Sequence, residues 1–313
     1  MKILLPTSIP LDLDVPDRVT IAYYAPSEPV PEEHEDAQAL VAWGNPDELL
    51  ADAAKRLRSL RWVQTLAAGP DAAMNAGFAP DVVITSGRSL HDLPVAEHAL
   101  ALVLAGARRL HTLVRAQLDH RWASEIGGMQ PAHDPAVFTT LRGSRVLVWG
   151  FGSIARTVAP HLVALGATVT GVARSAREDS GFPVISVDQL EAELPGTDVL
   201  LMILPSSAST HRVLNAARLA LLPKHAWIVN VGRGSTVDED ALLDALRGQR
   251  IGGAAVDVTS VEPLPADSPL WDQPNLIITP HAAGGRPIGA VRLIEENLTS
   301  LLNGSPLRNT VSD

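Results

Sequence analysis

The sequence predicts an α/β protein with two Rossmann-like domains, each built on a doubly wound parallel sheet, with an interdomain cleft. From Arg145 onward, six short apolar runs alternate with helical segments, which is the strand number of a complete doubly wound parallel sheet. Before that point, five more apolar runs are separated by helical or loop segments. The length of 313 residues fits one large domain or two ordinary ones.

Composition narrows the class of protein. With 46% hydrophobic residues the chain can bury a substantial core, and its formal net charge of −10 disfavours nucleic acid and anionic membranes as partners. The absence of cysteine removes disulfides, thiolate metal sites and cysteine nucleophiles. The apolar run before Pro6 is too short for a signal peptide, and no run of about 18 apolar residues could span a bilayer. We therefore expect a soluble cytoplasmic protein.

The N-terminal part of the chain is expected to form a small α/β domain. A helix should begin at Pro46, with Asn45 as its N-cap, and the acidic, proline-rich stretch 26–37 should be a surface loop leading into a helix. The expected strands are 3–5, 19–23, 39–43, 62–66 and 82–85. A single long helix, 94–118, should follow, and then a polar, glycine-bearing stretch, 119–144.

The second half of the chain should form the larger sheet. Its expected strands are 145–149, 168–172, 199–203, 226–230, 251–256 and 275–279. Its expected helices are 153–165, 187–194, 212–222 and 238–247, and a last helix, 287–302, should return to the first domain. The predicted division is 1–92 plus 284–313 for one domain and 93–283 for the other.

A glycine-rich turn follows the strand 145–149. Gly150, Gly152 and Ala155 form a GxGxxG motif with alanine in the third place, between a strand and a helix. Gly150 provides the tight turn, Gly152 lets the phosphates approach, and Ala155 is small enough for the helix to lie on the strand. This unit places a dinucleotide pyrophosphate at a helix N-terminus.

Three chemically active residues follow late strands of the same domain. Arg233 comes after the strand around 227–230, Glu262 lies in the segment that begins at Asp257, and His281 follows Thr279-Pro280. The carboxyl ends of the parallel strands are where such a fold binds its ligands. A histidine and an acid without a second ligand cluster do not make a metal site, so we expect no metal.

These motifs carry a family resemblance. Asn-Val-Gly-Arg-Gly-Ser at 230–235, Asp-Val with Glu-Pro-Leu-Pro at 257–265, and Thr-Pro-His at 279–281 resemble the D-isomer-specific 2-hydroxyacid dehydrogenase family. The similarity covers nearly the whole chain, from Gln64 to the final helix. It implies that a nicotinamide dinucleotide and a small 2-oxo or 2-hydroxy acid are the ligands, and that the chain forms a homodimer through its nucleotide domains.

The resemblance gives each residue a role in reducing a 2-oxo acid. His281 would donate the proton, because imidazole titrates near neutral pH, Glu262 would stabilise its imidazolium form, and Arg233 would hold the carboxylate and polarise the carbonyl. Backbone amides near Ala68 and Gly69 would complete the carboxylate site, although Pro70 lacks the amide that the family usually has there. The resemblance also implies that the cofactor is lined by Ser153, Ile154, Pro205, Val231 and Asp257. Asp257 would lie near the carboxamide of the nicotinamide.

The end of the second strand bears on the choice of cofactor. Ala173 stands roughly where NAD-binding proteins carry an acid for the ribose 2′-hydroxyl. Arg174, Ser175 and Arg177 would instead bind a 2′-phosphate, which favours NADP(H). NAD(H) is the alternative if Arg174 only stacks on the adenine. The remaining histidines, among them His98, have no such context and are interpreted as structural or exposed.

The leading hypothesis is therefore an NADPH-preferring reductase of small 2-oxo acids of the glyoxylate/hydroxypyruvate type. Trp43-Gly44-Asn45-Pro46 and Arg286-Pro287 resemble that branch of the family. Two alternatives stay open: an NAD-linked phosphoglycerate dehydrogenase, and a dinucleotide-sensing corepressor that keeps the fold without catalysis.

Overall fold

The computed structural model describes residues 1–129 and 137–311, and the predicted stretch 119–144 lies partly outside them. The chain forms two compact units, Met1–His91 with Arg286–Asp313, and Asp92–Gly285. The α/β fold with two parallel-dominated sheets is confirmed. Within the described residues, no helix has the length and apolar character needed to cross a membrane.

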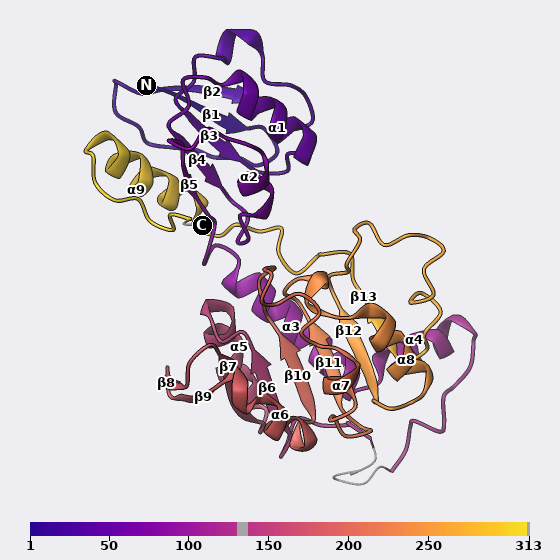
Figure 1. The fold of residues 1–313 in the computed structure, drawn as a ribbon. Coiled ribbons are helices and arrows are strands. Elements are labelled where there is room, and N and C mark those ends of the chain that lie inside the picture. The colour runs from indigo at the N-terminus through magenta and orange to yellow at the C-terminus, as the bar shows by residue number, and fades with distance from the viewer. Residues whose placement is uncertain (130–136, 312–313) are drawn as a thin grey trace. The chain divides into compact units, whose positions relative to one another are not determined.

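The first unit contains a five-stranded, entirely parallel sheet with the order β2-β1-β3-β4-β5 (Figure 1). The strands are β1 (Lys2–Pro6), β2 (Thr20–Tyr24), β3 (Ala39–Ala42), β4 (Trp62–Thr65) and β5 (Val83–Thr85). Helices α1 (Asp47–Arg56) and α2 (Asp71–Asn75) cover one face of this sheet, and α9 (Ala290–Leu302) covers the other. The last helix is thus part of the first unit, as expected from its place after the final strand.

The start of α1 differs from the prediction. Asn45 is not the N-cap, because Pro46 precedes the first helical residue and no side chain caps it. The Asn45 carboxamide oxygen instead accepts hydrogen bonds from the Trp43 amide and from the Tyr24 hydroxyl, at 3.1 and 3.0 Å. A side chain already engaged with β2 and the end of β3 cannot also turn to the helix. The loop 26–37 contains only a short 3-10 turn, Glu32–His34.

The second unit contains an eight-stranded sheet with the order β13-β12-β11-β10-β6-β7-β9-β8. The strands are β6 (Arg145–Trp149), β7 (Thr168–Ala173), β8 (Arg177–Asp179), β9 (Phe182–Ser186), β10 (Val199–Met202), β11 (Trp227–Asn230), β12 (Gly253–Val256) and β13 (Leu276–Ile278). All six predicted strands are present, but the predicted number is wrong, because β8 and β9 form an additional antiparallel hairpin. The chain leaves β6 for β7 on one side and returns as β10 on the other.

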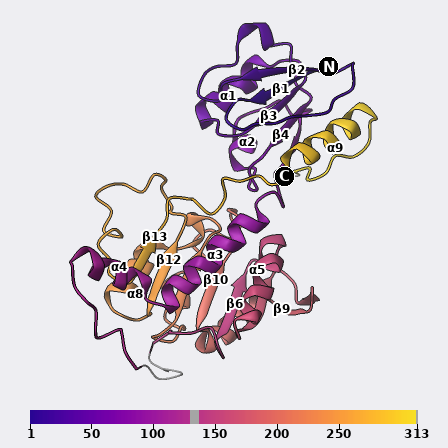
Figure 2. The ribbon, with the colours of Figure 1, turned by 180° about the vertical axis from the view of Figure 1, so that it is seen from behind.

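Helices cover both faces of this sheet. Figure 2 shows α3 (Asp92–Ala107) and α5 (Ser153–Ala164) on one face, where their buried side chains share a core with β6 and β10. On the other face, α6 (Leu190–Glu193), α7 (Ala216–Leu219) and α8 (Glu239–Arg247) pack on a second core. The helix predicted at 187–194 is reduced to α6 with a 3-10 turn on each side. The helix predicted at 212–222 is reduced to α7.

The single helix predicted for 94–118 is wrong, because the chain breaks between α3 and α4 (Leu110–Leu118). Arg109 has φ of 52°, in the left-handed region, and this ends the first helix. The apolar spacing continues across the break, but it does not mark one buried face. Leu110 and Val114 are 46% and 51% exposed, whereas Val103 on α3 is buried.

Candidate active site

The glycine-rich turn has the geometry that a pyrophosphate site needs. Gly150 has φ of 102°, and a Cβ atom there would lie 2.5 Å from the carbonyl oxygen of Ile203, so only glycine fits. Gly152 precedes α5, and the space around its Cα on the side-chain side is open. Ala155 is fully buried. The first N–H groups of α5 have no acceptors within the helix, so this end can bind an anion.

The other residues predicted to line the cofactor lie at the start of α5 and in the loops after β10 and β11. Ser153 donates a hydrogen bond to the Asp92 carboxylate at 2.9 Å, and Ile154 is half-buried against the core. Pro205 is exposed in the segment after β10, and Val231 is buried directly after β11. These loops follow the carboxyl ends of adjacent parallel strands.

The basic residues after β7 differ in whether their side chains are bonded to other groups of the chain. Arg174 and Ser175 are exposed, and the Arg174 guanidinium has no hydrogen bond or ion pair within the described chain. Arg177 pairs with Asp179 at 2.9 Å and donates to the carbonyl oxygen of Phe151 in the glycine turn at 3.0 Å. The bonding of Arg177 to Asp179 and Phe151 was not predicted, because the sequence does not show which of the two arginines has partners within the chain.

Asp179 is held by two guanidinium groups. Arg156 on α5 donates to both of its carboxylate oxygens, at 2.7 and 2.9 Å, and Arg177 donates to one of them. The hydrogen bonds from Arg156, with a smaller contribution from Arg177, hold the pKa of Asp179 well below its usual range. The β8–β9 hairpin is thereby tied to the helix that follows the glycine turn.

Arg233 lies in a tightly constrained loop after β11. Its carbonyl oxygen accepts hydrogen bonds from the Asn230 amide and the Thr236 hydroxyl, at 3.1 and 2.6 Å. A Cβ atom on Gly234 would lie 2.1 Å from the carbonyl oxygen of Thr259, so the loops after β11 and β12 are in close contact. The guanidinium donates to the carbonyl oxygen of Gly232 at 2.8 Å and is half-buried.

His281 and Glu262 form a direct pair. The His281 Nδ1 atom lies 2.7 Å from a Glu262 carboxylate oxygen, and the two side chains are 47% and 38% exposed. The other carboxylate oxygen accepts the Thr259 amide at 3.0 Å. Since an ionised carboxylate only accepts hydrogen bonds, Nδ1 carries a hydrogen and Nε2 is the atom available to a ligand.

Asp257, predicted to lie near the cofactor carboxamide, is bound by hydrogen bonds within the second unit. Its side chain is 1% exposed, and both carboxylate oxygens accept hydrogen bonds from the segment that carries His281. His98, expected from the sequence to be structural or exposed, also has its Nε2 atom 3.3 Å from Oδ1 of this carboxylate. Its position on α3, far away in the sequence, gave no local signal of this contact.

Ala68 and Gly69 follow β4 in the first unit. Neither backbone N–H group donates to a described residue, so both can serve a ligand. Pro70 has no N–H group and immediately precedes α2. Among the described residues, no group of three or more histidine, aspartate or glutamate side chains could hold a metal ion.

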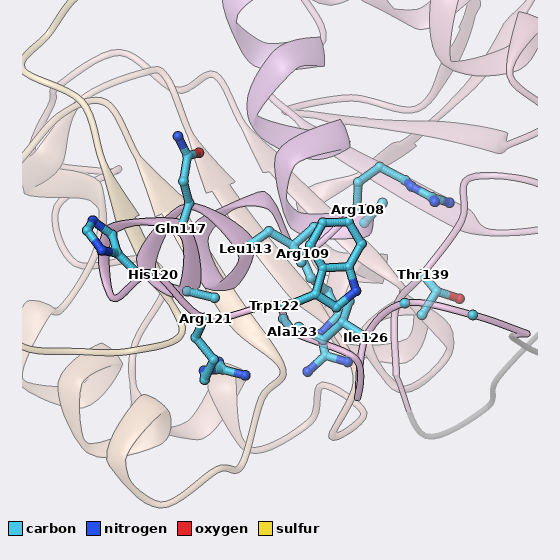
Figure 3. A pocket seen from close by; sticks show the side chains of 14 residues that line it. Arg108, Arg109, Leu113, Gln117, His120, Arg121, Trp122, Ala123, Ile126 and Thr139 are labelled. Carbon is cyan, nitrogen blue, oxygen red and sulfur yellow. The ribbon is translucent and has the colours of Figure 1, made fainter.

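A cavity of about 800 Å³ lies apart from these loops, at the junction of α3 and α4. Figure 3 shows Trp122 beside Ile126 and Arg109 at its wall. Trp122 is 90% exposed, and Leu118, at the end of α4, is 74% exposed. Large apolar side chains are rarely so exposed in a cluster on a monomer, so this region is a candidate for a protein contact.

Comparisons with known proteins identify the family of the chain. The profile of the D-isomer specific 2-hydroxyacid dehydrogenase NAD binding domain matches residues 100–283. Glyoxylate/hydroxypyruvate reductase A of Citrobacter koseri is 31% identical over 290 residues, which cover 90% of this chain and 88% of the relative.

Solved structures from the same family have the same fold. A D-isomer specific 2-hydroxyacid dehydrogenase family protein from Aeromonas salmonicida has a TM-score of 0.82 at 28% identity and covers 99% of this chain and 98% of its own. A dehydrogenase from Xanthobacter autotrophicus, solved with NADPH and MES, has a TM-score of 0.78 at 31% identity and covers 100% and 98%. The chain therefore belongs to the D-isomer-specific 2-hydroxyacid dehydrogenase family and is an NAD(P)-dependent oxidoreductase.

Proposed function

We propose that the chain is an NADPH-preferring reductase that converts small 2-oxo acids of the glyoxylate/hydroxypyruvate type to D-2-hydroxy acids. The observation that carries the proposal is the His281–Glu262 pair, which occupies Nδ1 of the imidazole and leaves Nε2 available to a ligand. The 31% identity to a glyoxylate/hydroxypyruvate reductase supports the substrate class.

The reaction needs a hydride at the carbonyl carbon, a proton at its oxygen and a site for the carboxylate. When bound, the reduced nicotinamide supplies the hydride. His281 donates the Nε2 proton to the carbonyl oxygen, and Glu262 stabilises the imidazolium form that precedes the transfer. Arg233 makes a fork to the carboxylate and polarises the carbonyl. In the reverse direction, Nε2 accepts the hydroxyl proton.

We also propose that the two parts of the chain bind different ligands. Residues 93–283 would bind the dinucleotide, with Gly150, Gly152, Ser153 and Ile154 at its pyrophosphate. Residues 1–92 plus 284–313 would select the substrate, with the N–H groups of Ala68 and Gly69 as further donors to its carboxylate. The family profile over 100–283 and the uncommitted state of those two amides support it.

NADP(H) is the proposed cofactor, with NAD(H) as the alternative. An acid at the end of β7 would repel a 2′-phosphate, and the chain has Ala173 there instead. Arg174 has its charge uncommitted within the described chain, and Ser175 is exposed beside it. A relative that is 31% identical was solved with NADPH, which supports the same choice.

We propose a homodimer in solution. The exposed apolar side chains of Leu110, Val114, Leu118 and Trp122 follow one another along α4 and the segment after it. Light scattering after size-exclusion chromatography should give twice the monomer mass of 33.2 kDa. A monomer at micromolar concentration would refute this proposal.

Initial rates test the proposed activity. Glyoxylate, hydroxypyruvate, phenylpyruvate and 3-phosphohydroxypyruvate should each be assayed with NADPH and with NADH. We expect the first two with NADPH to be fastest. Fastest turnover of 3-phosphohydroxypyruvate with NADH would favour a phosphoglycerate dehydrogenase, and tight dinucleotide binding without any turnover would favour a sensor.

The proton donor is tested separately. His281→Ala should lower kcat about 10²- to 10⁴-fold, which is the usual contribution of general acid catalysis. His161→Ala removes an exposed histidine of α5 and serves as the matched control. Near-normal turnover by His281→Ala would show that another group supplies the proton.

A further inference from the structure

We propose that His98 is a positioning residue for the reaction, which acts through Thr279 and Asp257 on the loop that carries His281. The inference rests on the proposed function, because it assumes that His281 donates the proton. All four residues belong to the second unit.

Asp257 binds three consecutive amides of the loop that carries His281. Asp257 accepts the His281 amide on its backbone oxygen at 2.7 Å, the Ala282 amide on Oδ1 at 2.8 Å and the Ala283 amide on Oδ2 at 3.0 Å. His281 has φ of 51°, a backbone conformation that non-glycine residues rarely adopt. Such a conformation persists only where its surroundings hold it, and three consecutive amides bound to Asp257 provide that hold.

The hydrogen positions around Asp257 follow from its neighbours. The Thr279 hydroxyl lies 2.6 Å from Asp257 Oδ1 and must donate to it, because an ionised carboxylate only accepts. The Thr279 oxygen can then only accept a further hydrogen bond. His98 Nε2 lies 3.0 Å from that oxygen and 3.3 Å from Oδ1, so Nε2 must carry a hydrogen and donate it.

The carboxylate therefore fixes the direction of the chain of hydrogen bonds, and the imidazole supplies its first donor. His98 donates to Thr279, and Thr279 donates to Asp257, whose carboxylate orients the amides after His281. His98 lies on α3, which packs against β12, the strand that leads into Asp257. Its side chain is 23% exposed, while that of Asp257 is 1% exposed. Removing the imidazole takes away the donor that holds the Thr279 hydroxyl from the side of α3, while the buried carboxylate keeps the amides of Ala282 and Ala283.

The experiment compares three substitutions at His98. His98→Leu should lower kcat about 10- to 100-fold, because small displacements of a catalytic group are that costly. The dissociation constant of NADPH, measured by fluorescence titration, should stay within about twofold. His98→Gln should recover most of the rate, since its amide nitrogen lies near the place of Nε2 and carries hydrogen. His98→Asn, whose amide corresponds to Nδ1, should not recover it.

Two further measurements separate positioning from simple loss of structure. The solvent deuterium isotope effect on kcat should increase in His98→Leu, because proton transfer from a misplaced His281 becomes more rate-limiting. His161→Leu, at an exposed position of α5, should change neither the rate nor the isotope effect. Thermal unfolding of each variant shows whether it is folded under assay conditions.

The outcomes distinguish this inference from the proposed function. If His281→Ala is inactive and His98→Leu behaves like His161→Leu, the positioning role is refuted and the proton donor stands. Equal rate losses in His98→Leu and His98→Gln would also refute the role. If His281→Ala keeps its turnover, the proposed role of His281 as proton donor is refuted, and the positioning role of His98 is refuted with it.

Discussion

Replacing Arg174 by alanine should remove the preference for NADPH. Arg174 is exposed and uncommitted within the described chain, so its full interaction with a 2′-phosphate would be lost and no internal ion pair would offset the change. A hydrogen bond to a charged group contributes about 1.5–3 kcal/mol. That range corresponds to about a 10- to 150-fold fall in kcat/KM for NADPH. The value for NADH should change by about twofold or less.

The assay measures kcat/KM for both cofactors at saturating glyoxylate and constant low salt, because salt screens exposed charges. Arg177→Ala is the informative comparison. It removes the pair with Asp179 and the hydrogen bond to Phe151 in the glycine turn, so it should weaken both cofactors. A loss shared equally by NADH and NADPH in Arg174→Ala would refute the assignment of the phosphate site.

Two further predictions concern the junction of α3 and α4. A Cβ atom on Gly106 would lie 2.7 Å from the Trp227 ring, so Gly106→Val should cost about 1–3 kcal/mol in urea unfolding, unlike Ala101→Val at an exposed position. Burial, and then the charges of Arg115 and Arg109, lower the pKa of His111 to about 4 from its ordinary 6.5. The folded state therefore loses stability as pH falls from 6.5 to 4, because only the unfolded state gains the proton. His111→Gln should lose less over that window in urea titrations; an identical pH dependence would contradict this.

Most strands of both sheets were predictable because they contain short runs of apolar residues. β10 and β11 are buried at every position, as expected between two layers of helices. The β9 strand escaped prediction because Pro183 interrupts a half-buried segment at the edge of the parallel array. The break at Arg109 also escaped, since apolar spacing alone does not distinguish a buried face from an exposed one.

The candidate site was predictable in its residue types and less so in its contacts. The loops after β11, β12 and β13 place Arg233, Glu262 and His281 where the fold binds ligands, and the order of parallel strands dictates that position. The direction of a side chain depends on neighbours that are distant in the sequence. For that reason the sequence did not predict that the Asp257 carboxylate would accept a hydrogen bond from the Ala282 amide, or that the His98 imidazole would lie beside this carboxylate.

The discontinuity of the first unit has a consequence for engineering. This unit consists of two segments, Met1–His91 and Arg286–Asp313, so the second unit is an insertion between them. Arg233, Glu262, His281 and the glycine turn all belong to that insertion. On the proposed roles of the two units, a chimera that replaces both outer segments with those of a relative is expected to exchange substrate recognition and to retain the proposed catalytic residues. Such a swap needs two crossover points, at 91/92 and 285/286, and α9 must travel with β1, whose core it completes.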